Sequence, residues 1–282
     1  MNMTEKCPVC MNEMNRVFSG MLLKKNEVKY LYCETCGMLK TEKPFWLEEA
    51  YQKPIAETDT GLLQRNIANS KMVEPILHCL FKGKGKFLDV AGGYGVLTRL
   101  LRDMGFDCYS MDQYCQNLFA KAFDPDDGFR ANALFAFEVL EHIENPREFL
   151  KDLFDTYSCK TIIFSTLTFS GDIPKKNWWY YAFETGQHIS FYQPRTIVFL
   201  ASTLGCRYYR LGPELHLITD MRLQGFLHMV LTHRFVRKLF ALSLHWKRKR
   251  ISRTWSDHLL LKSMNGSVIE KQPPKPAKGI ET

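Results

Sequence analysis

A glycine-rich turn between an apolar run and a helical pattern is the segment of this chain best suited to hold a ligand. The apolar run 87–90 contains Asp89, the turn covers 91–95, and apolar residues at helical spacing continue over 96–104. Such a turn places bare backbone and a helix N-terminus against a bound cofactor. In a loop that holds a pyrophosphate, the first glycine stands where this chain has Asp89. A carboxylate there repels phosphate and suits a ligand with a positively charged end.

The turn resembles the first motif of class I S-adenosylmethionine-dependent methyltransferases, roughly Asp-x-Gly-x-Gly-x-Gly. Asp89, Gly93 and Gly95 match the motif. Ala91 replaces its first glycine, a mild departure because alanine is the next smallest residue. The resemblance implies that Asp89, Ala91, Gly93 and Gly95 bind S-adenosylmethionine, which carries a sulfonium and an ammonium and no phosphate. The alternative is a plain strand-to-helix turn, because a glycine cluster alone is weak evidence.

Two further acids follow in the order that this family shows. A short strand ends at Asp112, and an acid after the second strand of a doubly wound sheet lies beside the cofactor ribose. An apolar strand then leads through Glu138 into a Glu-Val-Leu-Glu-His sequence that ends at His142 and is similar to one that family members commonly carry. The resemblance therefore adds Asp112 and Glu138 to the cofactor-binding residues. Asn132 stands where the family commonly has an Asp, so any role of that acid is in doubt.

Two histidines are candidates for acting on the methyl acceptor. Methyl transfer from a sulfonium is an in-line displacement that needs an aligned acceptor and, for a hydroxyl or a carbon acid, a base. His188 has an intrinsic pKa suited to proton abstraction near neutrality, and it follows the fifth expected strand, where ligands bind in open α/β sheets. A structural histidine bonded to backbone is the alternative for His188, and His142 is the second catalytic candidate. The aromatic run 178–181 is either a wall for the acceptor or a packing layer.

Four N-terminal cysteines have the spacing of a metal site. Cys7 and Cys10 form one Cys-x2-Cys pair, and Cys33 and Cys36 form a second after a strand-like run. Each pair presents two thiolates from a tight turn, and four thiolates satisfy tetrahedral Zn²⁺ without an open position, which predicts a structural zinc ribbon. The alternatives are unrelated free thiols, disulfides or a redox pair. The other five cysteines are expected to be ordinary buried residues.

The elements that position these residues alternate between strand and helix. This alternation predicts an α/β fold with a doubly wound, mostly parallel, Rossmann-like sheet and a small N-terminal zinc ribbon. The third strand of the usual order is expected to be short, near 128–131. The other later elements are expected as a helix over 146–157 with Asn145 as its N-cap, a strand over 161–167, a helix over 194–204 and a strand over 206–211.

A helix that begins near residue 62 and breaks near Pro75 is expected to lead into the sheet. Its Arg65 either reaches the methionine carboxylate of the cofactor or lies on a solvated face. Toward the C-terminus, apolar residues at helical spacing over 221–249 predict a packed helix or lid, and the basic run 247–250 either contacts an anionic surface or is solvated. The stretch 255–261 is either a last strand or a cover for the sheet edge.

We divide the chain into five parts. These are a zinc-ribbon-like module (1–45), a helical connector that roofs the cofactor (46–82), the cofactor-binding methyltransferase domain (83–220), a helical or lid extension (221–265) and a disordered tail (266–282). The hydrophobic content of 45% is enough for a full core. The sequence shows no apolar run of about 18 residues and no apolar signal segment, and we expect a cytoplasmic protein without a transmembrane helix.

The leading hypothesis is methyl transfer to a small-molecule acceptor, either a sugar, a nucleotide-linked sugar or a related metabolite. The segment 186–192 and the four-cysteine module resemble bacterial methyltransferases associated with sugar and polysaccharide modification. One alternative is an RNA methyltransferase with a zinc module, which the net charge of +8 permits. It is not favoured, because the positive charge lies near the termini rather than among aromatic residues. The other alternative is a binding protein on an inactive fold, suggested by Ala91 and Asn132. The oligomeric state stays open.

Overall fold

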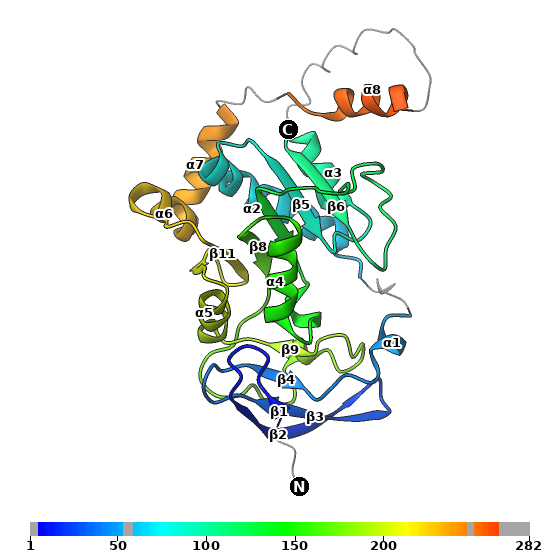
Figure 1. Ribbon diagram of the computed structural model, residues 1–282, viewed down its shortest axis with the longest axis vertical. Helices are drawn as coiled ribbons and strands as arrows, with labels where there is room; N and C mark the ends of the chain where they lie inside the picture. The colour runs from blue at the N-terminus through cyan, green and yellow to red at the C-terminus, as the bar shows by residue number, and fades with distance from the viewer. Residues whose placement is uncertain (1–4, 53–58, 247–250, 265–282) are drawn as a thin grey trace.

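The computed structural model describes residues 5–52, 59–246 and 251–264 (Figure 1). Two sheets organise these residues. A five-stranded sheet has the order β1-β2-β3-β4-β9, and a six-stranded sheet has the order β10-β11-β8-β7-β5-β6. Figure 1 shows the five-stranded sheet at the lower end of the molecule and the six-stranded sheet above it. The basic run 247–250 and the expected disordered tail lie outside the described residues.

The six-stranded sheet confirms the expected α/β fold. Four neighbouring strands, from β6 at one edge through β5 and β7 to β8, pair in parallel, and the antiparallel strands β11 and β10 complete the other edge. The strands are β5 (Lys86–Val90), β6 (Asp107–Met111), β7 (Ala133–Ala136), β8 (Thr161–Ser165), β10 (Arg207–Arg210) and β11 (Leu215–Thr219). β11 was not expected from the sequence, because its five buried positions show no alternation of polar and apolar residues.

Helices cover both faces of this sheet, as its buried strands require. One apolar cluster packs α4 and α5 on one face, and a second packs α2 and α3 on the other. The helices are α2 (Leu62–Phe81), α3 (Val96–Asp103), α4 (Pro146–Thr156) and α5 (Pro194–Thr203). The expected N-cap of α4 is confirmed, because Asn145 Oδ1 accepts a hydrogen bond from the backbone N–H of Glu148.

The expected break at Pro75 is wrong, because α2 continues through it. Pro75 removes one backbone hydrogen bond from the helix. It lies on the buried face with Val73, Ile76 and Leu77, whose side chains are fully buried. The packing of this face against the sheet therefore outweighs the loss of one helical bond.

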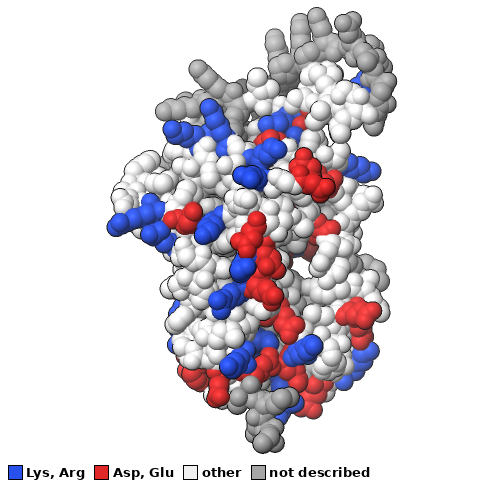
Figure 2. All heavy atoms as spheres, in the orientation of Figure 1, with Lys and Arg blue, Asp and Glu red and all other residues white. Residues whose placement is uncertain are grey.

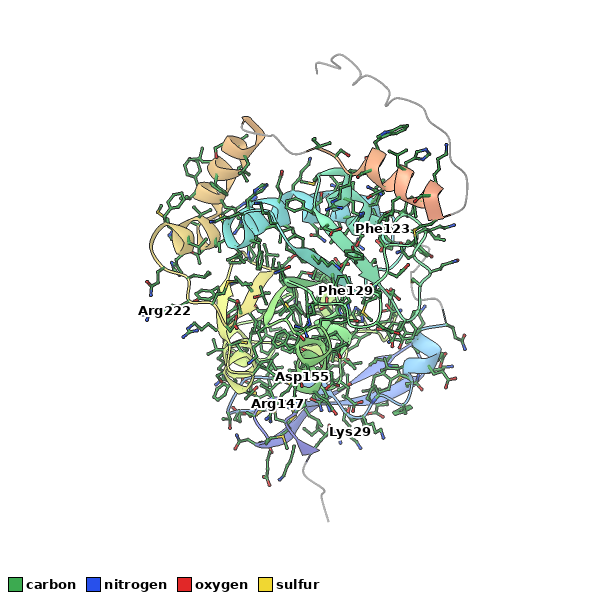
Figure 3. The ribbon with its side chains drawn as sticks, turned by 45° about the horizontal axis from the view of Figure 1, so that its top comes forward. Lys29, Phe123, Phe129, Arg147, Asp155 and Arg222 are labelled. Atoms are coloured by element: carbon green, nitrogen blue, oxygen red, sulfur yellow. The ribbon has the colours of Figure 1, made fainter. Side chains whose placement is uncertain are left out.

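The expected third strand near 128–131 is also wrong, because no strand forms in the described segment between β6 and β7. Aromatic side chains cover the edge of β6 instead. Phe123 and Phe129 pack on Tyr109, with ring centroids 6.4 Å and 4.7 Å apart (Figure 3). The backbone N–H of Ser110 donates to the carbonyl of Phe123. This cover shields the edge of the sheet without another strand.

The N-terminal sheet is built from two parts of the chain. Its first strands are β1 (Glu5–Lys6), β2 (Glu13–Leu22), β3 (Asn26–Tyr32) and β4 (Leu39–Thr41). The last strand, β9 (Ser190–Phe191), belongs to the loop after β8 and pairs with β4. A third apolar cluster fills the space between this sheet and the same loop. The predicted module boundary at residue 45 stays a prediction, but the sheet itself is shared with the later domain.

The described part of the C-terminal extension is helical. It contains α6 (Gly225–Thr232), α7 (Arg234–Trp246) and α8 (Thr254–Met264). The stretch 255–261 is therefore helix rather than strand. It is fixed by Asp257, whose carboxylate forms a buried ion pair with Arg102 of α3 at 2.6 Å. None of the helices in the described ranges is both long enough and apolar enough to span a membrane.

Candidate functional site

The glycine-rich turn follows β5 at the carboxyl edge of the sheet. Gly93 and Gly95 have φ angles of 57° and 79°, and Gly95 is the N-cap residue of α3. Ala91 has a φ of 56°, in the left-handed region that a Cβ atom disfavours. The expectation that alanine is a mild departure because it is small is therefore incomplete. Ala91 adopts the backbone conformation that glycine would take, at a cost of about 1–2 kcal/mol.

Asp89 is buried beneath this turn. Its side chain is 3% exposed, and neither Asp89 Oδ2 nor Ser110 Oγ has a hydrogen-bond partner. Both atoms face Gly92, because a Cβ there would lie 2.7 Å from Asp89 Oδ2 and 2.4 Å from Ser110 Oγ. Burial, and then the nearby Asp112 carboxylate, raise the pKa of Asp89 to about 8. The carboxylate that the sequence predicts at this position is therefore harder to ionise than an exposed one.

Asp112 ties the turn to the segment after β6. Its Oδ2 accepts a hydrogen bond from the backbone N–H of Gly93 at 2.9 Å. Its Oδ1 accepts from the backbone N–H groups of Tyr114 and Cys115. The structure thus brings Asp112 into contact with the glycine-rich turn, as the motif order predicts.

Glu138 lies at the carboxyl end of β7 in a strained conformation. Its φ is 57°, and its backbone N–H donates to Ser165 Oγ at 2.8 Å. Arg65 of α2 lies over it, with Nε 2.9 Å from Glu138 Oε1, and also forms two hydrogen bonds to Asp59. Arg65 therefore faces this edge of the sheet rather than only solvent. Strain of this kind collects at functional sites.

The structure brings the two candidate histidines together. His142 ends the short helix η1 (Leu140–His142), His188 precedes β9, and the ring centroids lie 4.9 Å apart. The carbonyl of Gln187 accepts from His142 Nδ1 at 3.0 Å, and the carbonyl of Tyr180 accepts from His188 Nδ1 at 2.7 Å. Because a carbonyl only accepts, each Nδ1 carries the proton and each Nε2 presents a lone pair. Burial lowers the pKa of His142 to about 4 and also lowers the pKa of His188.

A third member of this cluster, Glu141, was not singled out from the sequence. Its side chain is 2% exposed, and the hydroxyl of Tyr180 donates to its Oε1 at 2.9 Å. Its Oε2 has no hydrogen-bond partner. Burial raises the pKa of Glu141. The signal that could have found it is its place directly before His142 in the Glu-Val-Leu-Glu-His sequence.

Tyr51 connects the histidine cluster to the segment after β6. It follows α1 (Leu47–Ala50), and its ring stacks on Tyr114 at 4.9 Å between centroids. The same ring lies edge-on to His142 at 6.2 Å. The backbone N–H of Tyr114 donates to Asp112, which also accepts from Gly93, so the glycine-rich turn and the histidine cluster lie along one edge of the sheet. Sequence reasoning missed Tyr51, since nothing in the connector marks a single aromatic residue.

The aromatic run 178–181 is mainly a packing layer. Tyr181 is fully buried, lies edge-on to Tyr30 and stacks on Phe183. Trp179 is 73% exposed. Only one member of the run, Tyr180, contacts the cluster through its hydroxyl and its carbonyl.

The four N-terminal cysteines come together as expected. Cys7 Sγ lies 3.5 Å from Cys36 Sγ, Cys10 Sγ lies 3.4 Å from Cys33 Sγ, and all four sulfurs lie within 4.8 Å of one another. Sulfurs that share one tetrahedral Zn²⁺ at about 2.3 Å are about 3.8 Å apart. In each pair, the backbone N–H four residues after the first cysteine donates to its carbonyl. The donor set and its spacing fit a closed zinc site.

The cysteine turns pack against the N-terminal end of α5. Thr196 Oγ1 donates to the carbonyl of Cys36 at 2.8 Å, and Arg195 donates to the hydroxyl of Tyr32 at 2.7 Å. A Cβ at Gly37 would lie 2.4 Å from Gln193 Oε1, so a larger residue at this position would disturb the contact. The turns and α5 therefore form one packed unit.

A sequence profile described as a methyltransferase domain matches residues 63–211, just over half of the chain. No curated protein matches the chain in sequence. Solved structures similar to it include CalO1, a methyltransferase in calicheamicin biosynthesis, with S-adenosylhomocysteine bound. Its identity is 11%, the match covers 53% of this chain and 54% of that one, and the TM-score is 0.39.

Human N-acetylserotonin methyltransferase in complex with S-adenosylmethionine has 13% identity, coverage of 63% and 66%, and a TM-score of 0.39. Magnesium protoporphyrin IX methyltransferase from Synechocystis PCC 6803 with S-adenosylhomocysteine has 14% identity, coverage of 62% and 94%, and a TM-score of 0.37. For five of the similar structures, CalO1 and the human enzyme among them, the match covers 54% to 66% of the other chain.

We predict that Ala91→Gly raises the free energy of unfolding by about 0.5–1 kcal/mol. The strain energy that is relieved at this left-handed position exceeds the extra free-energy cost of ordering a glycine backbone on folding. Urea unfolding measures the change, and Ala201→Gly inside α5 is the control, expected to lower stability by about 1 kcal/mol. Destabilisation by both changes would contradict the conformation of Ala91.

We predict that Cys10→Ser removes about one zinc ion per chain and loosens the loop that carries His188, because metal binding and folding are coupled. Metal analysis measures the first effect, and faster amide hydrogen exchange at 189–191 measures the second. Cys79→Ser, outside the four-cysteine cluster, is the control. Unchanged metal content in the Cys10 variant would rule out the site.

Proposed function

Because this chain belongs to the methyltransferase domain family, we propose that it transfers a methyl group from S-adenosylmethionine to a small-molecule acceptor. The observation that carries the proposal is the placement of two unusual sets of groups along one edge of the sheet. One set is the pair of buried, unpartnered oxygens of Asp89 and Ser110, and the other is the cluster of Glu141, His142 and His188. The first suits a cationic donor and the second suits an acceptor.

The donor side fits S-adenosylmethionine by its chemistry. Asp89 and Ser110 offer acceptor oxygens for an ammonium group, and an ammonium beside Asp89 favours its ionised form. Asp112 lies at the turn where a ribose is bound in this class of fold. Arg65 is already paired with Glu138 and Asp59, so we propose that it positions Glu138 rather than binding the methionine carboxylate.

The acceptor side is proposed to hold the reactive oxygen of the substrate. When bound, S-adenosylmethionine supplies an electrophilic methyl group on its sulfonium. His142 and His188 present their Nε2 lone pairs toward the acceptor, and Tyr180 fixes the Glu141 carboxyl behind them. The partial burial of this cluster limits access of water, which favours transfer to the acceptor over loss of the methyl group to solvent.

Two features that suggested an inactive fold do not disturb this edge. Ala91 has a left-handed backbone conformation, which glycine adopts without strain. Asn132 lies at the opposite, amino end of the strands, where its Oδ1 accepts from the backbone N–H of Lys86. Both observations support a functional donor site.

The charge on the face seen in Figure 2 gives no support to RNA as the acceptor. In Figure 2, acidic side chains gather along the middle of the visible face, over α4, with Lys and Arg side chains around them. Figure 3 labels Arg147 and Asp155 on this helix. A surface for an RNA backbone needs clustered positive charge. The acceptors to test first are the sugars and nucleotide-linked sugars implied by the sequence resemblance.

The proposal is tested by transfer of a labelled methyl group from S-adenosylmethionine to a panel of sugars and nucleotide-linked sugars and, separately, to total RNA. We expect label in a small molecule. Label in RNA alone would contradict the acceptor class, and absence of donor binding by calorimetry would contradict methyl transfer itself.

We predict that Asp89→Asn weakens S-adenosylmethionine binding by about 10- to 100-fold, the loss of one charge-assisted contact. Because a cationic donor ionises Asp89, binding to the wild type releases a proton and tightens as the pH rises toward about 8. The variant should lack this pH dependence in calorimetry.

The folding stability of the protein by itself changes with pH in the direction opposite to the donor affinity. Burial raises the pKa of Asp89 in the folded protein, so the wild type loses stability as the pH rises toward and through about 8, and Asp89→Asn removes that loss. The exposed Asp127→Asn is the matched control. Donor binding that is equally tight and equally pH-dependent in the Asp89 variant would contradict the donor site.

We predict that His188→Ala lowers kcat by at least about 100-fold and leaves the affinity for S-adenosylmethionine unchanged. The reason is that His188 contacts the acceptor side and not the glycine-rich turn. Steady-state kinetics with an acceptor found in the panel, together with donor calorimetry, measures both effects. His258→Ala in α8 is the control, and an unchanged kcat for the His188 variant would remove it from the site.

A further inference from the structure

Three buried or half-buried side chains next to the proposed acceptor offer metal ligands at one point. Glu141, His142 and His188 each provide one ligand atom, and these atoms lie within 4.8 Å of one another. Atoms that share a single ion at about 2.0–2.2 Å are about 3–4 Å apart. Side-chain adjustments of about 1 Å or less therefore close the three atoms around an ion.

The two imidazoles are oriented as metal ligands are. Each donates its Nδ1–H to a backbone carbonyl, that of Gln187 for His142 and that of Tyr180 for His188. Metal-binding histidines commonly use one ring nitrogen for such a bond, which fixes the tautomer and aims the other nitrogen at the metal. Here both Nε2 lone pairs stay available.

The carboxyl of Glu141 supplies an independent observation. Its Oε2 is buried without a hydrogen-bond partner, while Tyr180 holds its Oε1. Among the described residues, no Lys or Arg forms an ion pair with it. A buried polar atom left without a partner costs about 1–3 kcal/mol. A cation bound to Oε2 offsets this cost.

We propose that Glu141, His142 and His188 bind one divalent transition-metal ion, separate from the zinc of the four cysteines. Two imidazoles and one carboxylate suit ions such as Mn²⁺, Fe²⁺, Co²⁺ and Zn²⁺ better than Mg²⁺ or Ca²⁺, which prefer oxygen ligands alone. Three protein ligands leave coordination positions open, unlike four thiolates.

The role of this ion rests on the proposed function, although its binding does not. A hydroxyl of the acceptor that occupies an open position is acidified by the ion and releases its proton to solvent. The oxygen then uses an electron pair to form the new bond to the methyl carbon, and the electron pair of the broken carbon–sulfur bond stays on sulfur, which becomes a neutral thioether. In this arrangement His188 is a metal ligand, and the ion acidifies the acceptor.

The test is a titration of the full-length, zinc-loaded protein with Co²⁺, followed by visible absorption. We expect bands of cobalt bound to nitrogen and oxygen, saturating at about one ion per chain, without the thiolate-to-cobalt bands that occupation of the cysteines would give. His188→Ala and the isosteric Glu141→Gln should each weaken this binding by at least about tenfold. His258→Ala should bind as the wild type does, and equal thermal melting shows that the variants fold.

The two proposals fail separately in this experiment. Absence of cobalt bands in the wild type, or equal binding by all variants, would overturn the metal site while methyl transfer stands. Cobalt binding that depends on Glu141 and His188 supports the metal site, whether or not an acceptor in the panel is methylated. A panel without any methylated acceptor counts against the proposed function alone.

Discussion

The arrangement of the site depends on a two-residue strand pairing between distant parts of the chain. Leu39 pairs with Phe191 and Lys40 with Ser190, which adds β9 to the sheet of the cysteine module. Ile189, directly before β9, donates its N–H to the carbonyl of Glu141, and its own carbonyl accepts from the N–H of Thr41. The backbone beside His188 is thereby held between the module and η1. The four-cysteine N-terminal module therefore supports the loop that carries His188.

Several groups that cost stability lie at the carboxyl edge of the six-stranded sheet. Ala91 and Glu138 have left-handed backbone, and Asp89, Ser110 and Glu141 contain buried polar atoms without partners. Each such feature costs about 1–3 kcal/mol. Three apolar clusters elsewhere in the fold supply the stability that tolerates them. A cationic donor bound beside Asp89 and Ser110, and a metal ion bound to Glu141, would give these unpartnered oxygens the partners that they lack.

Much of the fold could be predicted from the sequence because its signals are local. The strand before the glycine turn, the N-cap Asn145 and the spacing of the four cysteines each depend on nearby residues, and the structure shows each as expected. The failures have tertiary causes. Packing of the buried face keeps α2 helical through Pro75, and aromatic residues around Phe123 cover the edge where a third strand was expected. The raised pKa of Asp89 depends on tertiary burial. The meeting of His142 with His188 depends on the pairing of β9 with β4, and a strand of two residues is too short to show a periodic pattern in the sequence.

The central claim is that donor and acceptor meet along one edge of the sheet, with the acceptor side completed by the loop that the cysteine module holds. A crystal structure of the full chain with S-adenosylhomocysteine tests it most directly. The account predicts the amino group of the ligand beside Asp89 and Ser110, and its sulfur directed toward Glu141, His142 and His188. Ligand bound at another edge of the sheet, or a His188 loop separated from His142 and from β4, would contradict the account.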